Sequence, residues 1–259
     1  MISEAVRHGA PARAQPRIAA GEMHVWHAWL DQPAAVVARL HGLLATDERA
    51  RAARFHFAPD RDRYIVGRGV LRSLLGAYTG RAPGQLEFRY GAFDKPQLVG
   101  AGPEFNVSHS GAVALLAFVD GVEVGVDVEL EGGEEFPRDR IAERFFSPAE
   151  VGVLRSLPTH ERPRAFLRCW TRKEAFIKAR GDGLSLPLDS FDVTLAPDAA
   201  PALLRTAWSD AEPPEWWLED LSDPARSYVA AVALRGRAPR LVTHDVADDI
   251  LSPRQPKKE

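Results

Sequence analysis

The sequence contains a single cysteine and no long hydrophobic run. Cys169 alone can form neither an internal disulfide nor a cysteine-based zinc site, which favours a reducing, cytoplasmic location. The longest uninterrupted apolar run covers the eight residues from Ala112 to Val119, whereas a membrane-spanning helix needs about 20. The first 21 residues lack the apolar stretch of a signal peptide. We therefore expect no membrane partner, and a flexible leader over residues 1–21.

The sequence also lacks a large excess of either charge sign. Thirty-three basic and 36 acidic residues give a net charge of −3, which disfavours a nucleic-acid binder with a broad basic face. Only five of the 33 basic residues are lysine, and three of these five, Lys95, Lys173 and Lys178, lie inside the chain. In a chain so rich in arginine, an internal lysine indicates a use for the compact ammonium group.

Periodicity predicts helices followed by strands, twice along the chain, which is typical of an α+β fold. The expected helices begin near Thr46, Asp60, Ser147 and Pro163, and the expected strands lie within residues 23–30, 105–130 and 191–234. Thr46 is the expected N-cap of its helix, and Ser147-Pro148-Ala149-Glu150 matches a capping box. We predict an N-terminal subdomain over residues 22–123, a C-terminal subdomain over 124–240 and a C-terminal tail over 241–259.

Two carboxylates, Asp127 and Glu129, stand two residues apart in an expected strand and therefore share one face. A solvated strand face tolerates such a pair. The alternative is a site for a divalent cation, most plausibly Mg²⁺, which prefers hard oxygen ligands. Asp120-Gly121 predicts a two-residue hairpin loop that would place Ala114 opposite Asp127.

Ser108 and His109 lie on the preceding expected strand. His109 could be an ordinary hydrogen-bonded loop histidine, or it could donate to a phosphate beside neighbouring hydroxyls. A Ser-His-Asp hydrolase is disfavoured, because adjacent side chains on an extended chain point apart and no Gly-x-Ser-x-Gly motif is present.

Glu174 and Lys178 are four residues apart in an expected helix and share one face. They could form a surface ion pair worth about 0.3 to 0.5 kcal/mol. They could instead supply a third carboxylate and a cation to a metal and phosphate site. Cys169, in the same helix, is expected to be core packing rather than a nucleophile.

Four stretches, in order, resemble the 4′-phosphopantetheinyl transferases of the surfactin-synthetase-activating type. They are Phe105–Gly111, Val124–Glu129, Arg144–Ser147 and Trp170–Lys178. The loop Gly183–Leu188 adds a fifth match, and Lys95 in Asp94-Lys95-Pro96 matches a further family position. The similarity covers about residues 23–235.

The resemblance implies an α+β, sandwich-like fold of two similar subdomains related by a pseudo-twofold axis, each an antiparallel sheet packed with helices. It implies Mg²⁺ held by Asp127, Glu129 and Glu174. It also implies coenzyme A bound between the subdomains, with its phosphates and nucleotide contacted by Arg51, Lys95, Ser108, His109 and Lys178. One basic position of the family falls on Glu48 here, where Arg49 could compensate.

The activity that this resemblance implies is that of a holo-[acyl-carrier-protein] synthase. A carrier-protein serine would attack the β-phosphate of coenzyme A, and 3′,5′-ADP would leave. Glu174, Lys178 and Asp127 are the expected catalytic residues, with Glu174 as the candidate base. Carrier domains of peptide synthetases, polyketide synthases and fatty acid synthases are all possible partners, and a monomer is expected.

Two other functions remain open at this stage. A Mg²⁺-dependent nucleotide pyrophosphohydrolase would use the same carboxylates with water as the nucleophile. A catalytically silent carrier-binding protein would keep the fold alone. Coenzyme A hydrolysis without a carrier would favour the former, and failure to bind coenzyme A with magnesium would favour the latter.

Overall fold

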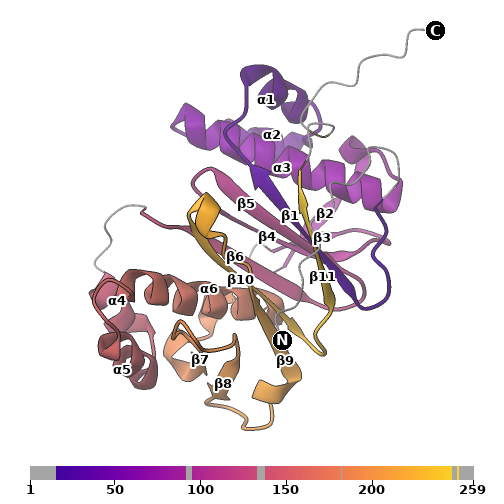
Figure 1. The fold of residues 1–259 in the computed structure, drawn as a ribbon. Coiled ribbons are helices and arrows are strands. Elements are labelled where there is room, and N and C mark those ends of the chain that lie inside the picture. Colours follow the sequence, from indigo (N-terminus) through magenta and orange to yellow (C-terminus); the bar gives the residue numbers. More distant parts are fainter. Residues whose placement is uncertain (1–15, 92–94, 133–137, 182, 247–249, 251–259) are drawn as a thin grey trace, which may run out of the picture.

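Two stacked β-sheets, each covered by helices on its outer face, form the four layers of the protein (Figure 1). The computed structural model describes residues 16–91, 95–132, 138–181, 183–246 and 250. The first sheet has the strand order β11-β1-β5-β4 and the second the order β6-β10-β9. Their strands are β1 (Glu22–Trp29), β4 (Glu104–Ser110), β5 (Val113–Val119), β6 (Val124–Leu130), β9 (Trp216–Asp220), β10 (Tyr228–Arg235) and β11 (Arg240–Asp245).

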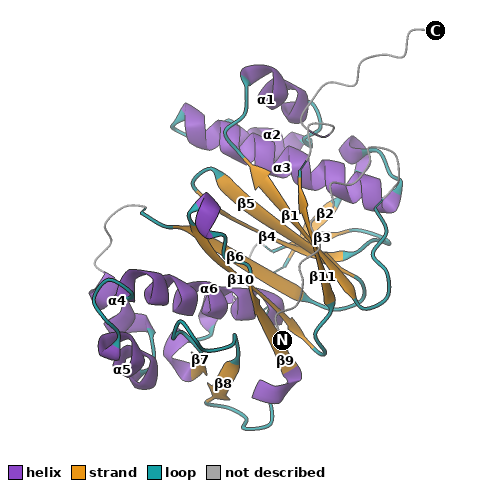
Figure 2. Cartoon of the chain, in the orientation of Figure 1, coloured by secondary structure: helices purple, strands orange, loops and turns teal. Residues whose placement is uncertain are grey.

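The helices lie on the two outer faces and two small hairpins complete the described fold (Figure 2). The helices are α1 (Ala34–His41), α2 (Thr46–Ala52), α3 (Ala58–Thr79), α4 (Arg138–Phe145), α5 (Pro148–Ser156) and α6 (Arg162–Arg180). The hairpins pair β2 (Phe88–Tyr90) with β3 (Pro96–Leu98) and β7 (Phe191–Val193) with β8 (Leu203–Thr206). The long helix α3 packs on the first sheet and α6 packs on the second. These elements agree with the predicted α+β class.

The middle of the protein is an apolar layer between the two sheets. Met23 and Leu115 of the first sheet pack there against Val126 and Val232 of the second. Strand β5 is buried along its whole length, because α3 covers one face and the second sheet covers the other. Burial on both faces explains why the apolar run at 112–119 does not alternate with polar residues.

The hairpin predicted at Asp120-Gly121 is wrong, because β5 and β6 belong to different sheets. Strand β5 pairs with β1 on one edge and β4 on the other, so it has no free edge for β6. Ala114 therefore lies opposite His109 of β4, not opposite Asp127. The tight turn of this region lies between β4 and β5, where Gly111 takes a φ of 53° that favours glycine.

The predicted C-terminal tail begins too early. Residues 240–245 form β11, which pairs in parallel with β1, so that Glu22 lies opposite Arg240. The end of the described chain thus returns to the first sheet and covers an edge of β1 that would otherwise expose unpaired backbone groups. The first sheet is consequently mixed, whereas the resemblance implied an antiparallel sheet in each half.

The helix starts follow the expected side-chain chemistry with one correction. The Ser147 capping box is confirmed, because Ser147 Oγ accepts from the Glu150 amide at 3.2 Å and Glu150 accepts from the Ser147 amide at 2.9 Å. Thr46 is not an N-cap. Helix α2 has Ala45 at that position, and Glu48 Oε2 accepts from the Ala45 amide at 2.8 Å. Glu48 closes the start of α2 in place of the predicted hydroxyl.

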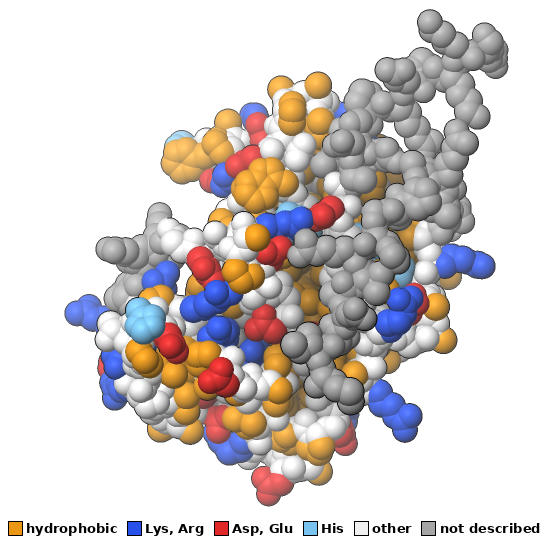
Figure 3. All heavy atoms as spheres, viewed as in Figure 1, with side chains coloured by type: hydrophobic (Ala, Val, Ile, Leu, Met, Phe, Trp, Pro, Cys, Tyr) orange, Lys and Arg blue, Asp and Glu red, His pale blue; other side chains and the backbone are white. Residues whose placement is uncertain are grey.

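None of the helices in the described ranges combines the length and the hydropathy that crossing a bilayer requires. The space-filling view shows acidic and basic side chains interspersed on the face that it presents (Figure 3). That distribution agrees with the small net charge of the sequence.

Candidate active site

The candidate site lies along the seam where β4, the edge of the first sheet, meets β6, the edge of the second. No backbone ladder joins these two strands; side chains of β4 accept from backbone amides of β6 instead. Asn106 Oδ1 accepts from the Val126 amide at 2.9 Å, and Ser110 Oγ accepts from the Leu130 amide at 3.2 Å. Polar residues at alternate positions of β4 thus satisfy the exposed edge of β6 and fix the two sheets relative to each other.

Asp127 is the centre of the polar contacts along this seam. It is 4% exposed, and its Oδ1 accepts from Ser108 Oγ at 2.8 Å and from Lys178 Nζ at 2.6 Å. The Lys178 ammonium also donates to Ser108 Oγ at 3.1 Å and to the Val126 carbonyl at 3.3 Å. The structure therefore brings together three predicted site residues, one each from β4, β6 and α6.

The other two predicted carboxylates lie near Asp127 and carry raised pKa values. Burial raises the pKa of Glu129, and the Asp127 charge adds to this effect against a 2.8 Å hydrogen bond from Ser110 Oγ. Burial raises the pKa of Glu174 as well, followed by the negative charges of Asp127 and Glu129. Among the described residues the Glu174 carboxylate has no hydrogen bond or ion pair, so it is a half-buried, unpaired acid beside two others.

These features suit a cation, although the three carboxylates are not gathered around one point. No group of three acidic, histidine or cysteine side chains in the described chain is arranged to hold a metal ion as it stands. Asp127 Oδ2 is nevertheless buried without a hydrogen-bond partner among the residues that the structure describes, and burying such an atom is costly unless something pairs with it. Divalent cations favour carboxylate oxygens, and one here would also relieve the mutual repulsion of Asp127, Glu129 and Glu174.

His109 and Arg51 extend the site beyond the carboxylates. The His109 side chain is exposed, on the strand residue after Ser108. The surrounding protein desolvates its ring and lowers its pKa, and the positive charges of Lys178 and Arg51 act in the same direction. Arg51 is also exposed and lies over the Tyr64 ring, 5.5 Å from the centroid. These cationic groups near His109 form a surface suited to phosphate.

Lys95 reaches the edge of the same region but is already engaged. Its Nζ pairs with Glu123 at 2.5 Å, and it donates to the Val124 carbonyl at 3.2 Å and to the Lys178 carbonyl at 3.0 Å. An ammonium group has three N–H donors. The predicted phosphate contact of Lys95 would have to compete with these three protein acceptors.

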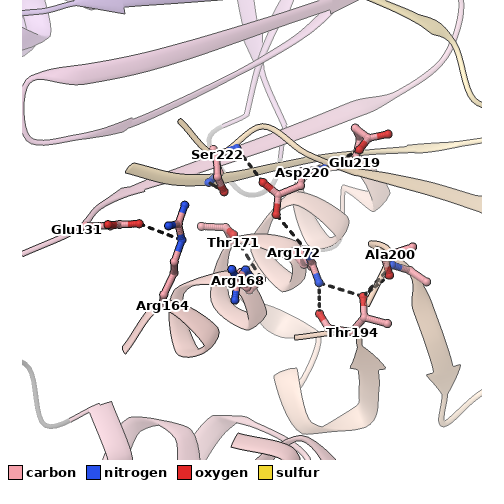
Figure 4. Close-up of polar contacts among 12 residues, drawn as sticks. Glu131, Arg164, Arg168, Thr171, Arg172, Thr194, Ala200, Glu219, Asp220 and Ser222 are labelled. Carbon is pink, nitrogen blue, oxygen red and sulfur yellow. Dashed lines mark hydrogen bonds and ion pairs between the residues drawn. The ribbon is translucent and has the colours of Figure 1, made fainter. Parts of the chain in front are cut away.

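Groups on the second sheet and on the β7–β8 hairpin fix the position of α6. Arg172 donates to the Thr194 carbonyl at 2.6 Å and lies 3.2 Å from Asp220 Oδ2, and Arg164 forms an ion pair with Glu131 (Figure 4). These residues were not predicted to matter, because an arginine in a helix pattern does not show its partners.

Lys173 is a further residue of α6 whose structural role the sequence did not indicate. Its side chain is fully buried, and its Nζ lies 2.8 Å from Glu150 Oε2 and donates to the Phe191 carbonyl at 2.5 Å. Lys173 therefore holds the helix rather than the ligand site. Cys169 is fully buried, and burial raises the pKa of its thiol, which confirms the expected core role.

Gly125 allows α6 to lie against β6. A Cβ atom at this position would come within 2.0 Å of the Ala175 carbonyl oxygen and 2.4 Å of the Ala179 amide. Only glycine permits so close an approach of helix and strand backbones. This contact sets the depth at which Glu174 and Lys178 stand above Asp127.

Glu48, at a position where a basic residue was expected, belongs to a buried network and not to the ligand site. It is 2% exposed, accepts from Arg72 Nε at 2.6 Å and pairs with Arg68. Burial opposes ionisation, but the hydrogen bond from Arg72 and the charge of Arg68 lower the pKa of Glu48 overall. Arg49 donates to the Gly42 carbonyl at 3.0 Å, so its predicted compensating role stays a prediction.

Comparison with protein families gives two matches along the chain. Residues 26–120 match the model described as 4′-phosphopantetheinyl transferase, N-terminal, and residues 123–233 match the 4′-phosphopantetheinyl transferase superfamily. The border between the matches falls in the turn between β5 and β6, where the chain passes from one sheet to the other.

Similar proteins agree with this family. The 4′-phosphopantetheinyl transferase HetI of Nostoc is 42% identical over 220 residues, covering 83% of this chain and 88% of that protein. A 4′-phosphopantetheinyl transferase of Bacillus subtilis is 32% identical over 204 residues, covering 73% and 89%. The solved holo-(acyl-carrier-protein) synthase from Bacillus anthracis in complex with CoA (3′,5′-ADP) is 21% identical with a TM-score of 0.37, covering 45% of this chain and 97% of that one. On the sequence matches, this chain belongs to the 4′-phosphopantetheinyl transferase family.

Proposed function

We propose that this protein transfers the 4′-phosphopantetheine arm of coenzyme A to a serine hydroxyl of a carrier protein and releases 3′,5′-ADP. The observation that carries the proposal is the meeting of β6 and α6. Asp127, paired with Lys178, lies there beside the unpaired carboxylate of Glu174. A site for phosphoryl transfer needs chiefly positioning and charge neutralisation, and this group of side chains offers acids and cations for both.

We propose Asp127, Glu129 and Glu174 as the residues that hold Mg²⁺. The support is the unpartnered Oδ2 atom of Asp127 and the raised pKa values of the other two carboxylates. When bound, the ion would neutralise charge on the pyrophosphate so that an oxygen nucleophile can approach. Ser108 and Ser110 hold Asp127 and Glu129 by their hydroxyl groups, and this contribution does not depend on the metal.

We place the coenzyme A phosphates beside His109, Ser108 and Lys178, and the nucleotide 3′-phosphate near Arg51. His109 is exposed and lies within the electrostatic reach of Lys178 and Arg51. Because the Ser108 hydroxyl already contacts Asp127 and Lys178, its first role is to orient those two groups. A direct contact of Ser108 with phosphate is a further part of the proposal.

The transfer step needs a proton acceptor for the attacking serine. The serine oxygen forms a bond to the β-phosphorus, and the bond from that phosphorus to the bridging oxygen breaks, so that 3′,5′-ADP leaves with the electron pair. Glu174 is the proposed acceptor of the serine proton, since its carboxylate is unpaired and a raised pKa makes it a better base. Lys178 supplies positive charge close to the reacting phosphate.

Both sides of the seam come from one chain, which supports a monomeric enzyme. The buried single cysteine supports a reducing, cytoplasmic setting.

The partner is an acyl or peptidyl carrier domain that presents a serine. Phe145, over which Arg144 lies 5.2 Å from the ring centroid, is half-buried and a candidate contact, whereas Phe146 belongs to the core.

The proposal is tested by measuring the intact mass of candidate carrier proteins after incubation with this protein, coenzyme A and Mg²⁺. A gain of one phosphopantetheine on the acceptor serine is expected. A carrier with that serine replaced by alanine is the control and should gain nothing. Unchanged mass for every type of carrier domain would contradict the proposal.

A further inference from the structure

Lys95 joins the two halves of the protein, residues 26–120 and 123–233, at the end of the helix that carries Glu174 and Lys178. It directly precedes β3 in the first half, yet the hydrogen bonds and the ion pair that its side chain makes with described residues lie in the turn before β6, in β6 itself and in α6. Its side chain is 16% exposed. The most exposed of the three partners is Glu123, whose side chain is 47% exposed. The hydrogen bonds of Lys95 to the two carbonyls are partly buried, whereas its contact with Glu123 is exposed.

The Lys178 carbonyl is one of the last four of α6, and such carbonyls have no partner within their own helix. Helix α6 ends at Gly181, which takes a left-handed φ of 83° and donates its amide to the Ile177 carbonyl at 2.9 Å. The next carbonyl, that of Lys178, accepts from Lys95 Nζ at 3.0 Å. A cation at this end also interacts favourably with the helix dipole.

The second carbonyl lies on β6, whose backbone closely approaches that of α6. Val124 begins β6, and Gly125 follows it at the place where β6 and α6 backbones approach each other. By donating to both Val124 and Lys178, Lys95 connects the start of the strand to the end of the helix. Three residues after Val124, Asp127 accepts from the Lys178 ammonium.

The contacts of α6 along its length differ in their origin. The part of α6 from Arg162 to Arg172 is held from within the C-terminal half of the chain, by the ion pair of Arg164 with Glu131 and the hydrogen bond of Arg172 to Thr194 (Figure 4). Its last turn is contacted from both halves: Lys95 donates to the Lys178 carbonyl from the N-terminal half, and Arg180 forms a 2.8 Å ion pair with Glu212 within the C-terminal half. Loss of the Lys95 contacts would therefore remove the link between the Lys178 carbonyl and the start of β6, while the contacts made within the C-terminal half stay in place.

We propose that Lys95 is a positioning residue, which holds the last turn of α6 against β6 so that the Lys178 ammonium stays on Asp127. This role differs from the phosphate contact that the sequence pattern predicts for Lys95. It rests on the proposed transfer function only in its consequence for catalysis. The structural part concerns the position of α6 and can be measured without a substrate.

The test compares Lys95→Met with the wild-type protein in steady-state transfer and in amide hydrogen exchange. Removing the ammonium should lower kcat by about tenfold or more while KM for coenzyme A changes by less than about threefold, since transition-state alignment is lost rather than ground-state binding. Amides of residues 177–181 should exchange at least about tenfold faster, with residues 164–172 unchanged. Lys95→Arg, which can still donate to both carbonyls, should restore most of kcat.

Glu123→Gln is the matched variant, because it removes the charged partner of Lys95 and leaves both carbonyl contacts. On the positioning account kcat falls slightly, by about twofold, and KM for coenzyme A is unchanged. If Lys95 instead binds phosphate, freeing it from Glu123 should lower that KM, and Lys95→Met should raise it more than about tenfold with kcat retained. This opposite pattern, or unchanged exchange of residues 177–181, would overturn the inference. Should Lys95→Met not fold, Glu123→Gln still decides by the direction of KM.

A failure of the proposed function gives a different result. A wild-type protein that modifies no carrier refutes the transfer activity, but the exchange rates of residues 177–181 still report whether Lys95 holds α6. Faster exchange in an inactive protein would leave the positioning role standing alone.

Discussion

Replacing Glu174 with glutamine is expected to remove most of the transfer activity without weakening the fold. The carboxylate has no hydrogen bond or ion pair among the described residues, so the isosteric amide loses no native contact. Burial and the charges of Asp127 and Glu129 raise its pKa, which means that the ionised acid is disfavoured where it stands. Removing the charge removes this repulsion, and the thermal midpoint Tm should equal or exceed that of the wild type.

The catalytic loss follows from the role of a general base, which is worth about 10² to 10⁴ in rate, or about 3 to 5 kcal/mol of barrier. The assay is the initial rate of carrier modification by intact mass, with Tm measured on the same sample. Glu161→Gln, immediately before the first residue of α6, is the matched control and should retain the full rate. A rate for Glu174→Gln within about tenfold of the wild type would exclude Glu174 as the base, and a Tm several degrees lower would show that its carboxylate stabilises the fold.

Three further predictions concern stability. Glu48→Ala leaves the buried Arg72 without its carboxylate and should cost about 3 to 5 kcal/mol in urea unfolding, whereas a cost below about 1 kcal/mol would show that the network is not needed. Gly125→Ala should prevent folding, because the backbone of α6 would have to move away by about 1 Å or more to make room for the Cβ atom, and its packing would be lost. A soluble variant with wild-type Tm would contradict the close contact. His244 has its pKa lowered to about 4, mainly by burial, so its neutral form is favoured in the fold. The stabilisation that His244 contributes is fully present above its ordinary pKa of about 6.5 and is lost as the pH falls toward 4. Over this range the free energy of unfolding should decrease by about 2 to 3 kcal/mol. His244→Gln should flatten the pH dependence of the urea midpoint in that window, and an unchanged slope would exclude His244 as its source.

The parts of the fold with a strong local pattern were predictable from the sequence. The capping box at Ser147 and the helical periodicity of residues 60–79 each correspond to an observed helix, because hydrogen bonds and spacing within one segment determine them. The family resemblance is confirmed by the matched models and relatives.

Strand pairing could not be read from neighbouring segments. The turn at 120–123 joins two strands that lie in different sheets, and β11 pairs with β1 from the opposite end of the chain. In both cases the partner is chosen by which edge is free after the sheet has formed, and no local residue pattern records that choice.

The candidate site was predicted by residue type better than by contact. Asp127 and Lys178 meet across β6 and α6 as expected of a shared site. The engagement of Lys95 with two backbone carbonyls and the burial of Glu48 were not foreseen, because a charged residue in a motif gives no sign of whether its partner is a ligand or the protein. The alternation of Asn106, Ser108 and Ser110 was a usable signal for the side chains that join β4 to β6.

We propose that the carboxylates of β6 and α6 promote attack by a carrier serine on coenzyme A. The most direct measurement follows the release of 3′,5′-ADP and the mass of the carrier in one reaction with coenzyme A and Mg²⁺. Nucleotide release is expected to require the carrier and to equal, mole for mole, the phosphopantetheine gained on its serine. Metal-dependent release at the same rate without any carrier would contradict this proposal and would identify water as the nucleophile.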